Sequence, residues 1–323
     1  MKKHILLLNA RRRVFIAKVM DKYLQRYHKE YEIASSDTDK LDPIAYAVKC
    51  FKILPKIEDG GFKRELLKFI KEDKIKGIIL WNNKDFKYIN NIKRDIEQLD
   101  CKILIPEKEK FEICYDKRKT NDFLCKNKIS TPKVYYHIDE LKKFPVIVKP
   151  YDGAGNMNIH KAENMDQLRL FVKITPNPII QEYIEGTHYT IDTYTDRKLH
   201  TFCVVPRERI KVRDAEVVIA KIQMKENLIK IGKLVSEKFA TNGPMNIQVI
   251  EGNNGIPYVI DMHCRFGGGT DLTIKAGANF HEWMIQDVLG MQENHEFKIN
   301  DKLIMTRYLH SIFIDSEKFS KIN

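Results

Sequence analysis

The first hundred residues alternate short apolar segments with amphipathic ones, and this rhythm constrains the fold more than any other feature. Strands are predicted where short apolar runs end in turn residues, at 4–8, 31–37, 76–81 and 101–106. Helices are predicted where apolar residues recur with helical spacing, at 14–27, 44–51, 62–74 and 86–99. Repetition of strand, helix and strand indicates a parallel sheet that is covered by helices.

The first strand–helix turn excludes one common use of such a sheet. It has the sequence NARRRVF at 9–15 and contains no glycine. Dinucleotide-binding folds need glycines at this turn, because the backbone must approach the pyrophosphate closely. A dinucleotide-binding function is therefore set aside.

Length, cysteine usage and charge limit the class of protein. With 323 residues the chain is too long for one typical domain, so two or three packed units are expected. No apolar run reaches the length of a membrane span. The six cysteines form no CxxC pair, and this cysteine usage favours a reducing cytoplasm. The net charge of +12 is spread along the chain without a nucleic-acid-binding motif. We interpret it as a lysine-rich surface around an anion site.

The rhythm changes after Asp116, and one segment there indicates chemistry. VIVKPYDGAGNMNI at 146–159 places a lysine at the end of an apolar strand and two glycines shortly after it. A phosphate clamp and a plain strand-turn-strand corner both fit this pattern. Strands dominate from 188 onward, with one helix predicted at 226–239. The GNNG turn at 252–255 predicts a hairpin.

The second strand of this hairpin carries a charged face. Asp261, His263 and Arg265 alternate along it, so their side chains point the same way. Pairing across the hairpin brings Gln248 alongside. A carboxylate beside a neutral acceptor suits Mg²⁺, and an arginine completes an anion site. Three glycines follow at 267–269, where the backbone is expected to approach another group closely.

Taken together, these segments resemble the ATP-grasp superfamily, and most closely the branch similar to the carbamoyl-phosphate synthase large subunit. The resemblance rests on DKRKTNDFLCKNKISTP (116–132), FPVIVKPYDGAGNMNI (144–159), IIQEYIEGTHYTID (179–192), VPRERIKVR (205–213), NIQVIEGNNGIPYVIDMHCRFGGG (246–269) and KAGANFHEWM (275–284). MTRYLHSIFI (305–314) is similar to the closing strand of that branch. The order of the segments along the chain makes the resemblance specific.

The resemblance implies an α/β fold in which two α+β subdomains clamp ATP. A small parallel-sheet α/β domain at 1–115 would precede an ATP-grasp domain at 116–323. Within the latter, the lid subdomain would span about 130–186 and the C-terminal subdomain about 187–323.

The resemblance also implies a role for each residue that matches the family motifs. Lys117 and Lys149 would hold the phosphates of ATP, and Gly153 and Gly155 would lie in the loop that covers them. Backbone groups of the hinge would bind the adenine, and the hinge residues are Gln181, Glu182, Tyr183 and Ile184. His188 would contact the ribose hydroxyls. The metal ligands would be Gln248, Asp261 and His263, and the catalytic residues Arg265, Lys149 and Arg207.

Three departures from the family pattern concern the site. The family usually has a glutamate where His188 stands. Its metal motif is Glu-x-Asn, whereas this chain has Asp261-Met262-His263. Histidine suits transition metals better than Mg²⁺, so Mn²⁺ is an alternative ion. The loops at 9–13 and 81–86 also differ from the family, so a particular substrate cannot be carried over.

The activity implied is ligation driven by ATP. A carboxylate would be activated as an acyl phosphate and joined to an amine, with release of ADP and phosphate. The partners would be small molecules, with no nucleic acid and no membrane, and a homodimer is compatible with this function. Two alternatives keep the fold: a phosphotransferase whose phosphorylated product is released, and a nucleotide-binding module without ligase activity.

Overall fold

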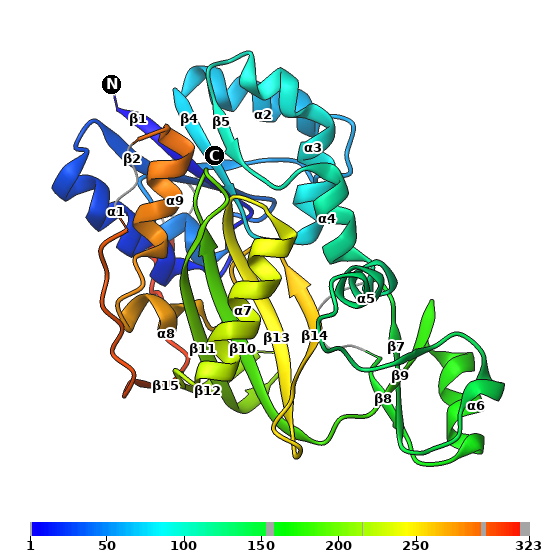
Figure 1. Ribbon diagram of the computed structural model, residues 1–323. Helices are drawn as coiled ribbons and strands as arrows, with labels where there is room; N and C mark the ends of the chain where they lie inside the picture. Colours follow the sequence, from blue (N-terminus) through cyan, green and yellow to red (C-terminus); the bar gives the residue numbers. More distant parts are fainter. Residues whose placement is uncertain (1, 153–157, 215, 292–294, 317–323) are drawn as a thin grey trace. The chain divides into compact units, whose positions relative to one another are not determined.

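The structure is a computed structural model that describes residues 2–152, 158–214, 216–291 and 295–316 (Figure 1). Gly153 and Gly155 therefore lie outside the described residues, together with most of the loop predicted to cover the phosphates. The chain divides into two compact units. The first comprises Met1–Lys108, Gly277–Lys298 and Tyr308–Asn323, and the second comprises Glu109–Ala276 and Ile299–Arg307.

The first unit is built on a parallel sheet of five strands in the order β3-β2-β1-β4-β5. Its central strand β1 is buried along almost its whole length, as an apolar run between two neighbours requires. The strands are β1 (Lys3–Leu8), β2 (Tyr31–Asp37), β3 (Cys50–Ile53), β4 (Ile75–Leu80) and β5 (Lys102–Leu104). The helices of its first segment are α1 (Val14–Tyr27), α2 (Phe62–Glu72) and α3 (Asn83–Glu97). The predicted parallel sheet with its helices is confirmed.

The helix predicted at 44–51 is wrong. The structure has a short 3-10 helix, η1 (Pro43–Tyr46), followed by β3. Pro43 opens η1 behind Asp42, whose side chain accepts a hydrogen bond from the backbone N–H of Ile44. Cys50–Ile53 instead pairs with β2 and extends the sheet at its edge. Backbone pairing with β2 therefore decides the structure of this segment, although its apolar residues have helical spacing.

A late segment of the chain returns to the first unit. Helix α9 (Phe280–Leu289) packs on β4, where a Cβ on Gly77 would lie 2.7 Å from Val288 Cγ2. Glycine at 77 therefore allows the helix to approach the strand. The sequence predicts an N-terminal domain at 1–115, and by their contacts the described residues of 277–298 group with the same sheet.

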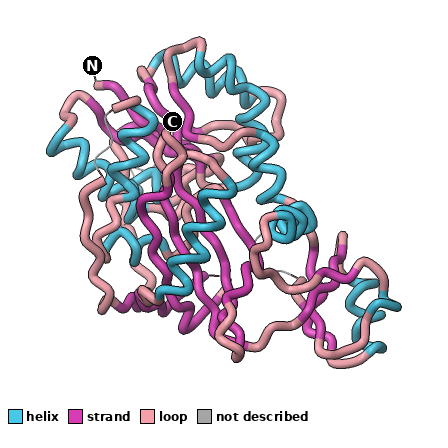
Figure 2. Tube along the Cα trace, viewed as in Figure 1, coloured by secondary structure: helices cyan, strands magenta, loops and turns pink. Residues whose placement is uncertain are grey.

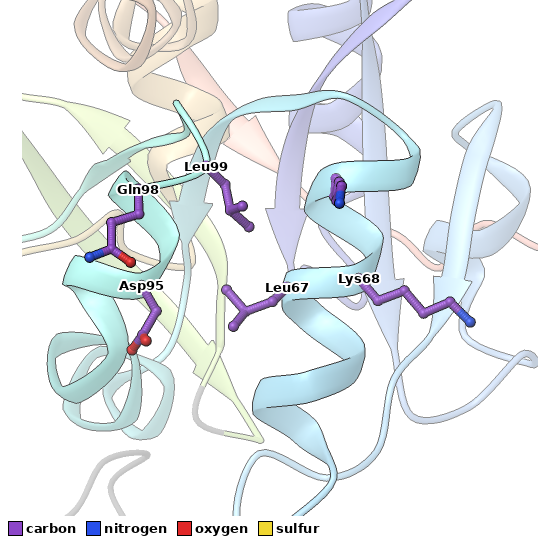
Figure 3. Close-up of a pocket in the computed structure, with 6 residues that line it drawn as sticks. Leu67, Lys68, Asp95, Gln98 and Leu99 are labelled. Atoms are coloured by element: carbon purple, nitrogen blue, oxygen red, sulfur yellow. The ribbon is translucent and has the colours of Figure 1, made fainter.

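A shallow groove of about 440 Å³ lies on the first unit (Figure 3). Leu67 and Leu99 point toward each other between α2 and the end of α3, and Lys68, Lys71, Asp95 and Gln98 complete the lining. The groove contains none of the residues predicted to carry chemistry.

The second unit contains an antiparallel sheet of six strands in the order β14-β13-β10-β11-β12-β15. Strands are drawn in magenta in Figure 2. The strands are β10 (Gly186–Thr195), β11 (Thr201–Arg213), β12 (Glu216–Ile222), β13 (Gly243–Gly252), β14 (Pro257–His263) and β15 (Ile304–Thr306). The predicted hairpin is confirmed as β13 and β14. The predicted closing strand is much shorter than 305–314, because only Ile304–Thr306 pairs with β12.

Helix α7 (Glu226–Phe239) lies along one face of this sheet (Figure 1). Leu228, Val235 and Phe239 of the helix join Ile191 and Ile247 of the sheet in one apolar cluster. Because side chains alternate along a strand, the residues between these apolar positions point to the other face. That other face carries the charged residues of the site.

A smaller antiparallel sheet has the order β6-β9-β7-β8. Its strands are β6 (Val134–Tyr135), β7 (Val146–Pro150), β8 (His160–Ala162) and β9 (Pro178–Glu182), with η2 (Ile138–Glu140) and α6 (Met165–Ile174) beside them. It has its own apolar cluster around Val146, Val148 and Leu168. Helices α4 (Lys108–Tyr115) and α5 (Lys117–Lys126) precede it, and α8 (Thr270–Lys275) follows β14.

In the part of the chain that the structure describes, no helix combines the length and the apolar character that a membrane crossing needs.

Candidate active site

Lys149 is the buried cation of the site. It lies on β7 with 7% of its surface exposed, and burial lowers the pKa of its ammonium group to about 8. Asp261 raises that pKa and Lys117 lowers it, so all three groups lie within electrostatic reach. They come from the smaller sheet, from β14 and from the start of α5. An ordinary strand-end lysine would extend into water.

Backbone contacts fix the start of α5 beside the end of β7. The N–H of Lys117 donates to the carbonyl of Tyr151 at 2.8 Å, and Asp116 forms a β-bridge with Asp152. The guanidinium of Arg118 lies 3.5 Å from the ring centroid of Tyr151 and is also bound by Asp116. The two lysines are therefore placed by elements that are tied together directly.

The predicted metal ligands lie together on the polar face of the large sheet. Gln248 pairs directly with Asp261 across the hairpin, as expected, and Asn246 pairs with His263. The Nε2 atom of His263 lies 3.4 Å from Oδ2 of Asp261. Burial would raise the pKa of Asp261, but His263, Lys117 and Lys149 together hold it well below its usual range. Asp261 therefore remains a carboxylate.

Arg209 also belongs to this face. The sequence offers Arg207, Arg209 and Arg213 together as residues of which one binds a substrate carboxylate or phosphate, and Arg207 is the one predicted to be catalytic. Its Nη1 donates to Oε1 of Gln248 at 3.4 Å. Burial lowers the pKa of its guanidinium, and the neighbouring Arg207 lowers it further. Burial lowers the pKa of the His188 imidazole, and the nearby charge of Arg209 lowers it further. The sequence signal for Arg209 is its position two residues after Arg207 on one strand.

Arg207 takes a different position from the one expected of a substrate-binding group. It is 1% exposed, and its Nε and Nη2 donate to the Asp192 carboxylate at 2.7 and 3.2 Å. Asn246 Nδ2 donates to the same carboxylate at 2.8 Å, and the hydroxyl of Thr273 on α8 is bound to it as well. The result is a buried network that joins β10, β11, β13 and α8.

Two of the three glycines, Gly267 and Gly269, close over this network. A Cβ on Gly269 would overlap the guanidinium of Arg207, and one on Gly267 would overlap the side-chain amide of Asn246. Arg307 fixes the same turn by donating to the carbonyl of Gly268 at 2.8 Å. The close approach expected of these glycines is therefore to the protein's own buried side chains. Arg265, just before the turn, donates from Nη1 to the carbonyl of Phe266 at 2.8 Å.

The predicted hinge residues connect the two sheets of this unit. Gln181 and Glu182 end β9, and β10 begins at Gly186, so Tyr183 and Ile184 lie in the linking segment. Gln181 is buried and its Nε2 donates to the carbonyl of Pro132 at 3.4 Å. The carboxylate of Glu182 accepts from the N–H of Lys133 at 3.2 Å.

Family models match most of the chain. The model described as "ATP-grasp domain" matches residues 114–269, and the one described as "PylC-like, N-terminal domain" matches residues 5–104. The chain belongs to the ATP-grasp superfamily. The predicted fold class, an ATP-grasp fold preceded by a small parallel-sheet α/β domain, is confirmed. The finer assignment to the carbamoyl-phosphate synthase branch stays a prediction.

Individual relatives agree with this ATP-grasp assignment. D-alanine--D-alanine ligase of Fusobacterium nucleatum subsp. nucleatum is 28% identical over 142 residues, which cover 41% of this chain and 50% of that ligase. The match thus spans half the length of that relative.

Two solved structures are similar in fold. Biotin carboxylase from Campylobacter jejuni has a TM-score of 0.75 at 14% identity, covering 93% of this chain and 74% of that one. L-amino acid ligase from Bacillus licheniformis has a TM-score of 0.68 at 20% identity, covering 90% of this chain and 75% of that one.

Proposed function

We propose that the protein is an ATP-dependent ligase that joins a carboxylate to an amine. The observation that carries this proposal is the buried Lys149 on β7, with the start of α5 tied to the residue Tyr151 just beyond that strand. The charges of Lys149 and Lys117 both lower the pKa of the Asp261 carboxyl on β14. Two cations beside a carboxylate that stays ionised suit a polyphosphate with a bound divalent cation. The membership in the ATP-grasp superfamily and the relatives named above support the same activity.

The donor set on β13 and β14 fits a divalent cation. Asp261 and Gln248 offer a carboxylate and an amide oxygen, which suit Mg²⁺. His263 adds imidazole nitrogens; its Nδ1 is buried and has no hydrogen-bond partner among the described residues. A nitrogen donor favours Mn²⁺ over Mg²⁺. Once bound, the ion would neutralise phosphate charge, and these three residues would hold it.

In this reaction the chain's own groups position and stabilise charge. Lys117 and Lys149 would bind the phosphates of ATP, while Arg265 would face the phosphoryl group as it moves to the substrate carboxylate. ADP then leaves, the amine attacks the acyl phosphate, and phosphate is released as the amide forms. Arg207 is better suited to hold the glycine turn than to touch substrate, because Asp192 binds it and both are buried.

For the carboxylate we propose an amino acid. Two of the relatives are named as ligases of amino acids, a D-alanine ligase and an L-amino acid ligase. The basic loop at 9–13 and the loop at 81–86 follow strands β1 and β4 of the parallel sheet. The β1 and β4 strands flank the point where the strand order reverses, and such points commonly bind ligands.

Two further features stay predictions from the sequence, a cytoplasmic location and a homodimer. The six cysteines are free thiols in the structure, as a reducing compartment requires.

The test is ADP release from ATP with Mg²⁺ or Mn²⁺ in the presence of single amino acids and of pairs, with mass spectrometry of the products. The expected product is an amide or peptide formed in step with ADP. Lys149→Ala should lower turnover about a hundredfold, because one preorganised charge on a transferred phosphoryl group contributes about 3 kcal/mol. Lys173→Ala is the matched control, since that lysine is exposed on α6.

The alternatives give different results in this assay. A phosphotransferase would release a stable phosphorylated acid without an amine. A nucleotide-binding module would bind ATP and release no ADP with any pair. Normal turnover by a folded Lys149→Ala variant would show that the phosphate site has been misplaced.

A further inference from the structure

Two thiols that the proposed chemistry does not use lie in contact next to the site. The Sγ atoms of Cys114 and Cys264 are 3.2 Å apart, although the residues are 150 positions apart in the sequence. Cys114 lies on α4, and Cys264 directly follows the last residue of β14. Both are free thiols in the structure. The sequence gives no sign of this pair, because no short spacing joins the two cysteines.

The two thiols have different surroundings. Cys114 is 4% exposed and belongs to the apolar cluster that also contains Leu124, Val259 and Met262. Cys264 is only partly buried and packs against the edge of that cluster. Cys264 is the more exposed of the two residues, so we expect a small oxidant to react there first, while Cys114 lies in the core in contact with its sulfur. Redox-sensitive pairs commonly combine an accessible thiol with a nearby resolving thiol.

We propose that Cys114 and Cys264 form a reversible oxidative modification site, a dithiol that closes to a disulfide and weakens the nucleotide site. The effect on nucleotide rests on the proposed function, whereas the disulfide itself does not. The oxidant is a hydroperoxide. Cys264 attacks the peroxide oxygen and becomes a sulfenic acid as water or an alcohol leaves.

Disulfide formation is the second step and balances the electrons. The sulfur of Cys114 attacks the sulfenic sulfur of Cys264, the S–S bond forms, and the hydroxyl leaves as water with the proton of the Cys114 thiol. The two sulfurs together give two electrons to one peroxide. A thiol reductant reverses the reaction by thiol–disulfide exchange.

The position of Cys264 explains why closure would affect the site. A disulfide bond is about 2.05 Å long, so the sulfurs must approach by roughly 1 Å from their present separation. Cys264 stands between His263, a proposed metal ligand, and Arg265, the proposed catalytic arginine. Cys114 is held within a packed core, so part of this movement falls on the strand end. Misplacement of site groups by 1 Å costs about a hundredfold in the activity of enzymes.

Peptide mapping tests the modification site. The full chain, first reduced, is treated with hydrogen peroxide, alkylated without reduction, digested and analysed by mass spectrometry. We expect a linked peptide pair containing Cys114 and Cys264 that disappears after treatment with dithiothreitol. Cys114→Ser and Cys264→Ser should each abolish it. Cys125→Ser, which removes an exposed thiol on α5, should leave it unchanged. Oxidation of Cys264 to a sulfinic acid with no linked peptide would overturn the proposal.

Calorimetric titration with ATP and Mg²⁺ tests the consequence without requiring turnover. We expect the oxidised wild type to bind at least tenfold more weakly than the reduced form, with recovery after reduction. Cys264→Ser, which removes the thiol that reacts with peroxide, should bind equally well before and after peroxide; if that variant does not fold, Cys264→Ala serves in its place. Equal ATP affinity of the linked and reduced forms would overturn the effect on the site. Failure of the reduced protein to bind ATP would instead count against the proposed function, and the linked peptide would still decide the modification site.

Discussion

Replacement of Asp192 by asparagine should destabilise the second unit strongly. Asp192 and Arg207 are each 1% exposed, and the carboxylate accepts both guanidinium hydrogen bonds described above. Asparagine keeps the size of the side chain but removes its charge, so a buried guanidinium remains without a counter-ion. Breaking one side of a buried pair costs about 3–5 kcal/mol. The Nη1 of Arg207 already has no hydrogen-bond partner among the described residues, so the network offers little compensation.

The assay is denaturant and thermal unfolding of the variant beside wild type. For a unit of this size each kcal/mol shifts the melting temperature by about 2–4 °C, so a drop of roughly 6–20 °C is expected. Glu226→Gln is the control, because it breaks an exposed pair with Lys230 on α7 and should change little. The double variant Asp192→Leu with Arg207→Met should recover only part of the loss. Apolar residues of similar volume can replace a buried pair, but the Asn246 amide and the Thr273 hydroxyl then lose their acceptor. A loss in Asp192→Asn no larger than that of the control would refute the reasoning.

Three other changes test separate parts of the structure. His263→Asn should shift metal preference from Mn²⁺ toward Mg²⁺, because the nitrogen donor is replaced by an amide oxygen; an unchanged activity ratio between the two metals would contradict the ligand role. Gly269→Ala should lower turnover at least tenfold and reduce stability, because its Cβ would overlap Arg207, whereas Gly268→Ala next to it meets no atom within 4 Å and serves as control for the stability effect. Burial lowers the pKa of His281 on α9 to about 4, below the ordinary value of 6.5. The unfolded chain therefore binds the proton first, and the stabilising effect of a neutral His281, present above pH 6.5, is lost as pH falls toward 4, by roughly 2–3 kcal/mol. His281→Gln should flatten this dependence when unfolding free energies are compared from pH 7 to pH 4; parallel curves would contradict it.

Local pattern predicts most of the elements but not their grouping. The helix bounds 14–27 and 226–239 agree with α1 and α7, because each has a continuous apolar stripe that faces one sheet. The segment 44–51 fails because β2 offers it backbone pairing that apolar spacing cannot express. Helix α9 joins the N-terminal sheet through a contact between Gly77 and Val288. Such a contact spans 211 positions of the chain, and no local signal encodes it.

Some features of the candidate site could likewise be predicted from the sequence, and others could not. Alternation along a strand is a rigid rule, so Asp261, His263 and Gln248 could be placed on one face before the structure was known. The same rule puts Arg207 and Arg209 on that face but cannot tell which of them is covered. The answer depends on the turn 267–269, which folds back over Arg207 and leaves Arg209 beside Gln248. Burial by a distant turn is a tertiary property.

The charged residues on the polar face of the large sheet form two groups, one that supports the structure and one that can attract a ligand. Asp192 neutralises Arg207 within the closed network, so that pair fixes the turn without adding to the field of the site. The charges of Lys117 and Lys149, in contrast, both act on Asp261, and Arg209 lies beside Gln248 on the same face. Among these described residues, three side chains are cationic and one is a carboxylate. A surplus of fixed positive charge at a partly buried surface costs free energy unless an anion binds, and a polyphosphate supplies several negative charges at once. The buried pair provides the rigid support, and the unbalanced group beside it provides the attraction for the ligand.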